Sequence, residues 1–303
     1  MVNKINKNPQ YKKLNTNHKA FSLIEISVVT IIIGILISGI SVGIDLYKDY
    51  QFVVARSVVQ NSRIPRINGL AVWYETISEK SFDKNQQKNN SSLTTWYDIN
   101  PNSNNKCNAN SPSATNNPIF VENAFNGYMP GVKFDGNNDY FSCNNISLTG
   151  QEITYFVVAK RTSNILYMSA FSSLSPGALF DSNSFAHFRA FLEDTSGKMS
   201  MFRNGWGSQI SHPGNNIAYI ATGIFDGTNS IAYINGAIGS VVASSGNFNV
   251  STLLIGTNWQ SGQAINFYSG IVAEIIIYNR ALKDKERMEV EKYLSKKWNI
   301  KIS

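Results

Sequence analysis

The chain has 303 residues, of which 43% are hydrophobic and 16% charged, a composition that excludes a disordered polymer. Five lysines of the 27 basic residues precede residue 21, so the rest of the chain has 22 basic residues against 20 acidic ones. This balance does not support a nucleic-acid-binding surface, which requires clustered Lys and Arg. The two cysteines exclude a four-cysteine zinc site and a multi-disulfide scaffold.

An uncharged apolar segment follows the lysine-rich leader. It covers residues 26–44 and would span about 28 Å as a helix, close to the hydrocarbon thickness of a bilayer. The apolar region of a secretory signal is shorter, about 7 to 15 residues, and precedes a small-residue cleavage site that does not occur here. The five lysines stand before the segment, whereas Asp45, Lys48 and Asp49 follow it. We therefore expect a single membrane-spanning helix with a cytoplasmic N-terminus and an exported remainder.

An acidic residue, Glu25, stands at the start of this apolar segment, where insertion scales give a cost of a few kcal/mol. The string KAFSLIE (19–25) combines a small residue, Phe and Glu before the apolar run. It resembles the processing motif of type IV prepilins and type II secretion pseudopilins. The resemblance implies that prepilin peptidase cleaves between Ala20 and Phe21 and that Phe21 is then N-methylated. It also implies that Glu25 meets the amino group of Phe21 on a neighbouring subunit during assembly.

The partners implied by this resemblance are prepilin peptidase, other pilin or pseudopilin subunits and the bacterial inner membrane. The alternative is a signal-anchor helix whose Glu25 lies near its cytoplasmic end. An amphipathic pattern continues to about residue 62, and Pro65 then disfavours helix at residue 64. We expect a leader peptide at 1–20, a transmembrane and stalk helix at 21–63, and a head domain at 64–303.

From residue 68 the sequence pattern changes to short runs of β-branched and aromatic residues, separated by clusters of Asn, Gly, Ser and Pro. This pattern is typical of an all-β sandwich. The Asn235-Gly236 pair predicts a type I′ hairpin turn, and helical spacing predicts a short helix at 281–298. The predicted strands are 70–74, 131–135, 153–160, 165–171, 185–192, 198–203, 217–225, 252–256 and 267–278, the last buried on both faces.

Several strings resemble pieces of the laminin-G-like, concanavalin-A-like jelly roll. They are GLAVWY (69–74), WYDIN (96–100), VKFDGNNDYF (132–141), AYING (232–236), LLIG (253–256) and GIVAEIIIYNRAL (270–282). The expected fold class is therefore mainly β, with a long N-terminal helix, an antiparallel two-sheet jelly-roll sandwich and a short C-terminal helix. Lectins, glycosidases and structural modules share this fold, so the fold alone does not give the function.

The acidic residues do not form the paired-carboxylate pattern of a glycosidase. Glu193 and Asp194 are adjacent and would face opposite sides of a strand, while Glu274 stands alone among apolar residues. Neither His187 nor His212 accompanies a nucleophile motif. We therefore expect a protein that is not an enzyme and that has no cofactor, with Ca²⁺ as the one candidate ion.

The Ca²⁺ candidate consists of Asp135, Asn137 and Asp139, which alternate and carry oxygen ligands. The same string is also a turn signal, and we favour the turn. Trp206 and Trp259 stand in loop-like contexts, where their rings would either stack on a glycan or protein ligand or cap the core. The sequence leaves both alternatives open.

The two cysteines, Cys107 and Cys143, are 36 residues apart on the side of the membrane expected to be oxidising. We predict that they form one disulfide, the alternative being two free thiols. The expected function is that of a non-enzymatic pilin-like or pseudopilin subunit with an exposed head, anchored by a single span in the inner membrane. The alternative is a carbohydrate-binding adhesin carried on a pilin-type helix.

Overall fold

The computed structural model describes residues 21–163, 167–174, 188–193, 197–203, 205–260 and 262–303. It divides into two compact units, one up to Asp49 and one from Tyr50 to Ser303. The long helix α1 (Leu23–Gln60) begins in the first unit and ends in the second, which confirms the predicted N-terminal helix. The domain bounds at residues 20 and 63 stay predictions.

Within the first unit, α1 is a helix long and apolar enough to cross a membrane. Its apolar side chains are exposed along the whole segment. The hydroxyls of Ser27, Thr30, Ser38 and Ser41 each donate to a backbone carbonyl three or four residues earlier, at 2.8 to 3.0 Å. These bonds satisfy the hydroxyls inside the helix itself, as a segment surrounded by hydrocarbon requires.

The second unit contains two large antiparallel sheets, and the first of them, sheet A, is built around β20 (Ser269–Tyr278). One edge of β20 pairs with β8 (Glu152–Arg161), and its other edge is divided between β5 (Met129–Asp135) and β1 (Leu70–Glu75). The remaining strands of sheet A are β4 (Ile119–Phe125), beside β5, and then β13 (Tyr219–Asp226), β14 (Asn229–Ile234) and β15 (Ala237–Ala243), which continue from β8.

Sheet B has the order β12 (Trp206–Ser211), β11 (Lys198–Phe202), β10 (Arg189–Glu193), β9 (Phe171–Leu174), β17 (Thr252–Ile255), β6 (Phe141–Cys143), β3 (Ala109–Asn110), β2 (Thr95–Trp96). Two small two-stranded sheets complete the strands of the described residues: β16 (Phe248–Val250) with β7 (Leu148–Gly150), and β18 (Asn258–Gln260) with β19 (Gln263–Ile265). Short 3₁₀ helices occur at Ile64–Arg66, Lys84–Gln86 and Ala114–Asn116.

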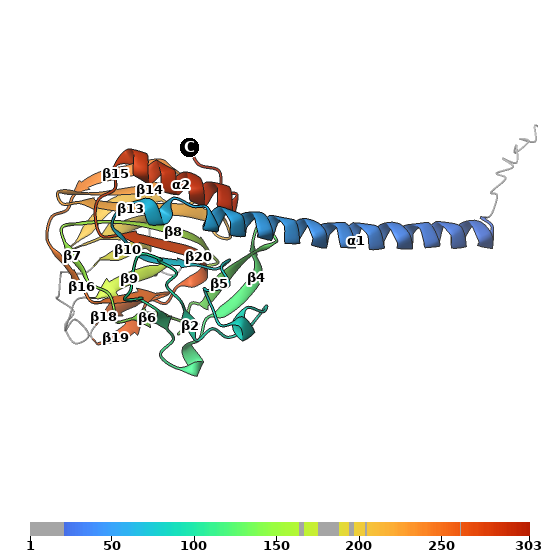
Figure 1. Ribbon diagram of the computed structural model, residues 1–303, viewed down its shortest axis with the longest axis horizontal. Helices are drawn as coiled ribbons and strands as arrows, with labels where there is room; N and C mark the ends of the chain where they lie inside the picture. Colours follow the sequence, from blue (N-terminus) through green and yellow to red (C-terminus); the bar gives the residue numbers. More distant parts are fainter. Residues whose placement is uncertain (1–20, 164–166, 175–187, 194–196, 204, 261) are drawn as a thin grey trace, which may run out of the picture. The chain divides into compact units, whose positions relative to one another are not determined.

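The main hydrophobic core lies between the two sheets, and a second core lies on the other face of sheet A. Along β8, Tyr155 and Val157 belong to the first core, whereas Phe156 and Val158 belong to the second. The second core is covered by α2 (Asp284–Trp298), which runs along sheet A (Figure 1) and buries Trp298 in it. All ten residues of β20 are buried, so the prediction of a strand covered on both faces is confirmed.

The end of α1 also packs on this second core, within the second unit. Ala55 is buried there, and Phe52 and Val59 pack against the same cluster. The guanidinium of Arg56 lies 2.8 Å from Glu79 and donates to the carbonyl of Ile77 at 3.3 Å. Residues 50–60 of the helix therefore belong to the second unit.

The predicted hairpin turn is confirmed, because Asn235 and Gly236 have φ angles of +50° and +81° between β14 and β15. The predicted strand 165–171 is wrong over residues 167–170. Tyr167 has a φ of +61°, which an extended strand does not permit, and β9 begins only at Phe171. Residues 165–166 and 185–187 of two predicted strands lie outside the described residues.

Candidate functional site

An exposed aromatic cluster lies on the face of sheet B that points away from sheet A. Residues Ala190 and Met201 belong to the core between the sheets, so their neighbours Arg189 and Phe202 point to the opposite face. Phe202 pairs with Trp206 across the sheet, and the two rings meet edge to face with centroids 6.0 Å apart. We call the surface formed by Tyr167, Arg189, Phe202, Trp206 and Trp259 the aromatic platform.

Trp206 and Tyr167 are the most exposed members of the platform, at 48% and 43% of their full accessible surface. Their ring centroids are 6.1 Å apart and tilted by 41°. The left-handed backbone of Tyr167 is fixed by the side-chain amide of Asn258, which donates to the Tyr167 carbonyl at 2.5 Å. These two large rings are thus partly exposed to solvent, where a ligand can contact them.

Trp259 lies on the β18–β19 hairpin and is half-buried, because its ring packs with Tyr140 against Leu174 and Leu254. Its carbonyl accepts a hydrogen bond from the Arg189 guanidinium at 3.4 Å. The two tryptophans predicted from their loop-like contexts therefore share one surface, but they differ in role. Trp206 presents its ring, whereas Trp259 mainly covers the apolar residues of β9 and β17.

Arg189 lies at the centre of the platform. Its guanidinium stacks over the Phe202 ring, 5.1 Å from the centroid. Burial lowers the pKa of Arg189 from its ordinary value. The sequence analysis missed Arg189, Phe202 and Tyr167. The strand alternation around Met199 and Met201 was a usable signal for Phe202, whereas nothing in the sequence indicates the left-handed turn at Tyr167.

The predicted Ca²⁺ residues form a turn that uses their carboxylates internally. Asp135 Oδ1 accepts the backbone N–H groups of Asn137 at 2.8 Å, Asn138 at 3.1 Å and Asp139 at 3.3 Å. Asp139 Oδ2 in turn accepts the N–H of Asp135 at 3.0 Å. Burial, together with the nearby charge of Asp135, raises the pKa of Asp139 to about 6. No group of three or more His, Cys, Asp or Glu in the described part of the chain is arranged to hold a metal ion.

The start of α1 carries the predicted processing motif. Ala20 lies outside the described residues, and Phe21 is 80% exposed. Glu25 Oε2 accepts the backbone N–H of Ser22 at 2.8 Å, and Ser22 Oγ accepts the N–H of Ile24 at 3.3 Å. These bonds pair a Ser with a Glu three residues later at a helix N-terminus. Glu25 therefore caps its own helix through the backbone N–H of Ser22, the residue that follows Phe21.

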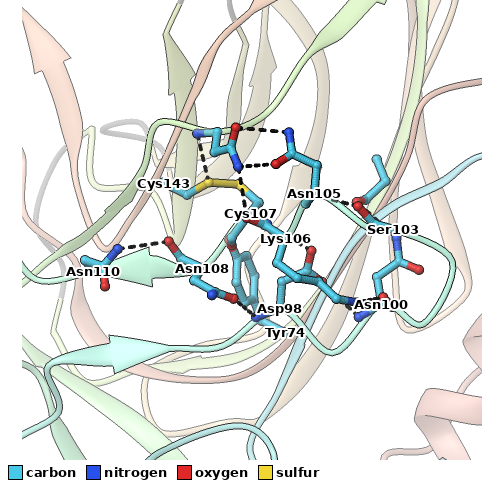
Figure 2. Close-up of a disulfide and its surroundings, with 12 residues drawn as sticks. Tyr74, Asp98, Asn100, Ser103, Asn105, Lys106, Cys107, Asn108, Asn110 and Cys143 are labelled. Atoms are coloured by element: carbon cyan, nitrogen blue, oxygen red, sulfur yellow. Dashed lines mark hydrogen bonds between the residues drawn. A yellow bond between two sulfur atoms is a disulfide. The ribbon is translucent and has the colours of Figure 1, made fainter.

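Cys107 and Cys143 form a disulfide with a Cα separation of 5.5 Å (Figure 2). The bond attaches the polar segment before Cys107 to β6. Buried Asp98 fixes the same segment, since its carboxylate accepts the N–H groups of Trp73 at 3.0 Å, Asn100 at 2.9 Å and Cys107 at 3.2 Å. The Tyr74 hydroxyl donates to the carbonyl of Cys107.

One carboxylate pair does occur in the head, and it corrects the expectation that Glu274 stands alone. Glu274 is the cross-strand neighbour of Glu75, and both are buried and lie 2.8 Å from Lys297. Both carboxylates are closed off from solvent, so this pair does not meet a glycoside substrate. Glu193 and Asp194 cannot be compared in this way, because the Glu193 side chain and Asp194 lie outside the described part.

The head has two histidines, His187 and His212. His187 lies outside the described residues. His212 accepts the N–H of Gly214 through Nδ1 at 2.9 Å and packs edge to face on Tyr219, with centroids 5.0 Å apart. Burial, followed by the nearby Arg161 charge, lowers the pKa of His212 to about 3. The imidazole is therefore neutral at physiological pH.

No protein-family model matches the sequence, and no curated protein matches it. Among solved structures, the chain is similar to domain 4 of AbnA, an extracellular GH43 arabinanase from Geobacillus stearothermophilus in complex with arabinotriose. The identity is 12% over 74% of this chain and 97% of that chain, with a TM-score of 0.53. This likeness shows that the head has the fold of that domain.

Two further structures have lower TM-scores. The carbohydrate-binding module CBM40 of the Ruminococcus gnavus IT-sialidase, bound to α2,3-sialyllactose, is 17% identical over 46% of this chain and 82% of that chain, with a TM-score of 0.39. The Trypanosoma rangeli sialidase in complex with DANA is 13% identical over 73% of this chain and 32% of that chain, with a TM-score of 0.45. The chain thus combines a helix long and apolar enough to cross a membrane with a β-sandwich head that shares the fold of the arabinanase domain.

Proposed function

We propose that this protein is a non-enzymatic pilin-like or pseudopilin subunit. Prepilin peptidase would remove residues 1–20, the helix at 21–63 would hold the protein in the inner membrane and in a filament, and the head at 64–303 would be exposed. The observation that carries the proposal is the start of α1. There Phe21 precedes the helix and Glu25 lies in its first turn, and the apolar side chains of the helix are exposed throughout the first unit.

An exposed apolar helix of this length is stable only against lipid or against other helices. A pilin-type subunit uses both environments in turn, since it waits in the bilayer and then packs with its neighbours. The position of Glu25 supports this, because its carboxylate already lies at the N-terminal end of α1. Cleavage after Ala20 would place a new amino group on Phe21, within reach of a carboxylate on the same or an adjacent helix.

The charge distribution supports an orientation with the head outside the cytoplasm. Five lysines precede the apolar run, and Asp45 and Asp49 follow it. The disulfide between Cys107 and Cys143 fits an oxidising compartment. We therefore propose a head in the periplasm or on an extracellular filament.

Mass spectrometry of the membrane fraction tests the processing step. We expect the mature chain to begin at N-methylated Phe21. Cells without prepilin peptidase serve as the control, and in them the chain should keep residues 1–20. A Met1 terminus in cells with an active peptidase would contradict the proposal, since a signal-anchor helix is left uncleaved.

The aromatic platform favours a second function, carbohydrate recognition by the head. Exposed Trp206 and Tyr167 offer ring faces of the kind that stack on sugars. The arabinanase domain with the same fold was solved with arabinotriose, which supports the proposal for this chain. A glycan array probed with the full chain in detergent tests it. Trp206→Ala should remove the signal, whereas Ile238→Ala, an equally exposed position on sheet A, should keep it.

A further inference from the structure

Arg189 is the one charged member of the aromatic platform, and its surroundings differ from those of Arg203 and Arg287, two buried arginines of the head. Arg203 is held by the carbonyls of Gln151 at 2.9 Å and Gly246 at 3.1 Å and by Ser244. Arg287 lies 2.5 Å from the carboxylate of Glu291. Both of these guanidinium groups are therefore satisfied by the protein.

Arg189 lacks a comparable set of partners. Its only hydrogen bond within the described part of the chain is the 3.4 Å contact to the carbonyl of Trp259, and no carboxylate whose side chain the structure describes pairs with it. A guanidinium carries five N–H donors in a planar fork. Among the described residues, most of these donors thus have no acceptor, although the group is half-buried against the Phe202 ring.

A half-buried cation without an anion is costly, and an exposed patch that maintains one is arranged for an anionic partner. The planar fork of Arg matches a carboxylate through two parallel N–H···O bonds. The guanidinium lies over the Phe202 ring, with its central carbon 5.1 Å from the ring centroid, so one of its sides is covered by the protein. The N–H groups of Arg189 can therefore donate hydrogen bonds to a carboxylate that approaches from solvent.

We propose that the aromatic platform binds an acidic sugar, whose carboxylate pairs with Arg189 and whose ring, or that of the next sugar, stacks on Trp206. The proposal rests on the carbohydrate-binding function proposed above and names its ligand class. The rings favour a saccharide over an acidic peptide, since Trp206 and Tyr167 expose faces instead of a groove for an extended chain. A single arginine also does not provide the clustered positive charge that nucleic acid requires.

The test compares uronic-acid oligosaccharides with the same oligosaccharides after their carboxyl groups have been reduced to alcohols. Binding of the full chain in detergent is measured by calorimetry or biolayer interferometry. We expect the acidic form to bind about 10- to 100-fold more tightly than the reduced form, as for one charge-assisted hydrogen-bonded pair. The difference should shrink as salt is added, because the platform is open to solvent.

Two variants assign the effect to Arg189. Arg189→Gln should abolish the preference for the acidic form, and Arg189→Lys, which keeps the charge and loses the fork, should recover only part of it. Trp206→Ala should weaken both forms alike. A thermal unfolding midpoint close to that of the parent shows that each variant is folded, and Arg189→Lys keeps the test valid should Arg189→Gln unfold.

Several results would overturn the inference. Equal binding of acidic and reduced oligosaccharides would contradict the proposed role of Arg189 but not the proposed carbohydrate binding. Binding confined to sulfated sugars would contradict the carboxylate assignment. Equally tight binding of a poly-glutamate peptide would contradict the choice of a sugar. The absence of binding to every glycan would overturn the carbohydrate function itself, and this inference with it.

Discussion

Glu75 and Glu274 lie opposite each other in β1 and β20, fully buried, and share one cation. The Nζ of Lys297, from α2, lies 2.8 Å from a carboxylate oxygen of each. The indole N–H groups of Trp73 and Trp298 also donate to Glu274, at 2.8 and 2.6 Å. This network fixes α2 on the outer face of sheet A at one register, because a shift by one residue would leave the charges unpaired.

Removal of the cation should therefore destabilise the head strongly. Lys297→Met leaves two carboxylates facing each other in the core, and we expect the free energy of unfolding to fall by about 3 to 5 kcal/mol. Lys296→Met, at an exposed neighbouring position, should change it by less than about 0.5 kcal/mol. Urea unfolding followed by tryptophan fluorescence measures both. Equal midpoints for the two variants would show that Lys297 is not needed to hold α2.

The same network predicts that the head loses stability at acidic pH. Burial alone would raise the pKa of Glu75, but the charge and hydrogen bond of Lys297 and the N–H groups of Ile77 and Ser78 lower it below its ordinary value. A carboxyl with a lowered folded pKa stabilises the protein above its unfolded pKa and loses that contribution as pH falls through the folded value. We expect stability to fall below about pH 4.5. Glu75→Gln should remove part of that dependence, which unfolding midpoints from pH 3 to 6 would measure.

The disulfide predicts a second, independent contribution to stability. Closing a loop of 36 residues stabilises a fold by about 3 to 4 kcal/mol in the chain-entropy model, so Cys107→Ser with Cys143→Ser should lose about that amount. In exported protein, thiol alkylation without reductant should label neither cysteine, and alkylation after reduction should label both. Labelling of both cysteines without reductant would contradict the bond and also the oxidising location of the head.

Much of the fold could be predicted from sequence because periodicity and turn chemistry are local. The apolar run gave α1, the Asn235-Gly236 pair gave the hairpin, and alternating apolar residues gave most strands of sheet A. Sheet B was harder to predict, since its strands are short and interrupted. The break at Tyr167 depends on a hydrogen bond from Asn258, 91 residues later in the chain.

The candidate site was only partly predictable for the same reason. Trp206 was named as a candidate from its loop-like string, although it is the first residue of β12, and its role in ligand binding stays a prediction. Arg189 became a candidate binding residue only once the structure was known. Its side chain lies over Phe202 of the neighbouring strand β11, and it has no carboxylate partner among the described side chains. The pairing of Glu75 with Glu274 likewise joins residues from the two ends of the head. Such pairings are long-range tertiary contacts, which a local sequence pattern does not predict.

The Asp135 turn predicts a pH dependence of the opposite sign. Because burial and the charge of Asp135 raise the pKa of Asp139 to about 6, the folded chain binds this proton more tightly than the unfolded one. Its contribution to stability is therefore present below about pH 4 and is lost as pH rises to about 6. Asp139→Asn, which keeps an acceptor for the N–H of Asp135, should flatten the unfolding midpoint over this range. Glu122→Gln, at an exposed carboxylate, should not.

The same measurement separates the turn from a Ca²⁺ site. The turn interpretation expects equal unfolding midpoints with and without Ca²⁺ at pH 7, because Asp135 Oδ1 already accepts three N–H groups. A rise in the midpoint with Ca²⁺ that Asp139→Asn removes would establish a cation site and contradict the turn interpretation.

The last prediction concerns Glu25, which caps α1 in the structure and which the proposed pilin function gives a second role in assembly. As a capping residue it accepts the N–H of Ser22, and as an assembly residue it would pair with the amino group of Phe21 on a neighbour. In lipid an unpaired carboxylate costs about 2.5 to 3.5 kcal/mol, so a charge partner would favour transfer of the subunit into the filament. Two substitutions distinguish the roles. Glu25→Val removes the acceptor and the charge, whereas Glu25→Gln removes the charge and keeps the acceptor.

We expect both variants to be cleaved after Ala20 but to stay largely in the membrane fraction, because the amino group that Glu25 meets forms only after cleavage. Sheared filaments and membranes are compared by immunoblot, and the N-terminus of each form is read by mass spectrometry. Normal assembly of Glu25→Gln with failure of Glu25→Val would assign Glu25 to helix capping. Normal filament assembly of both variants would show that Glu25 has no role in assembly. Only failure of both, with the N-terminus of each still at Phe21, fits a charge pair between subunits.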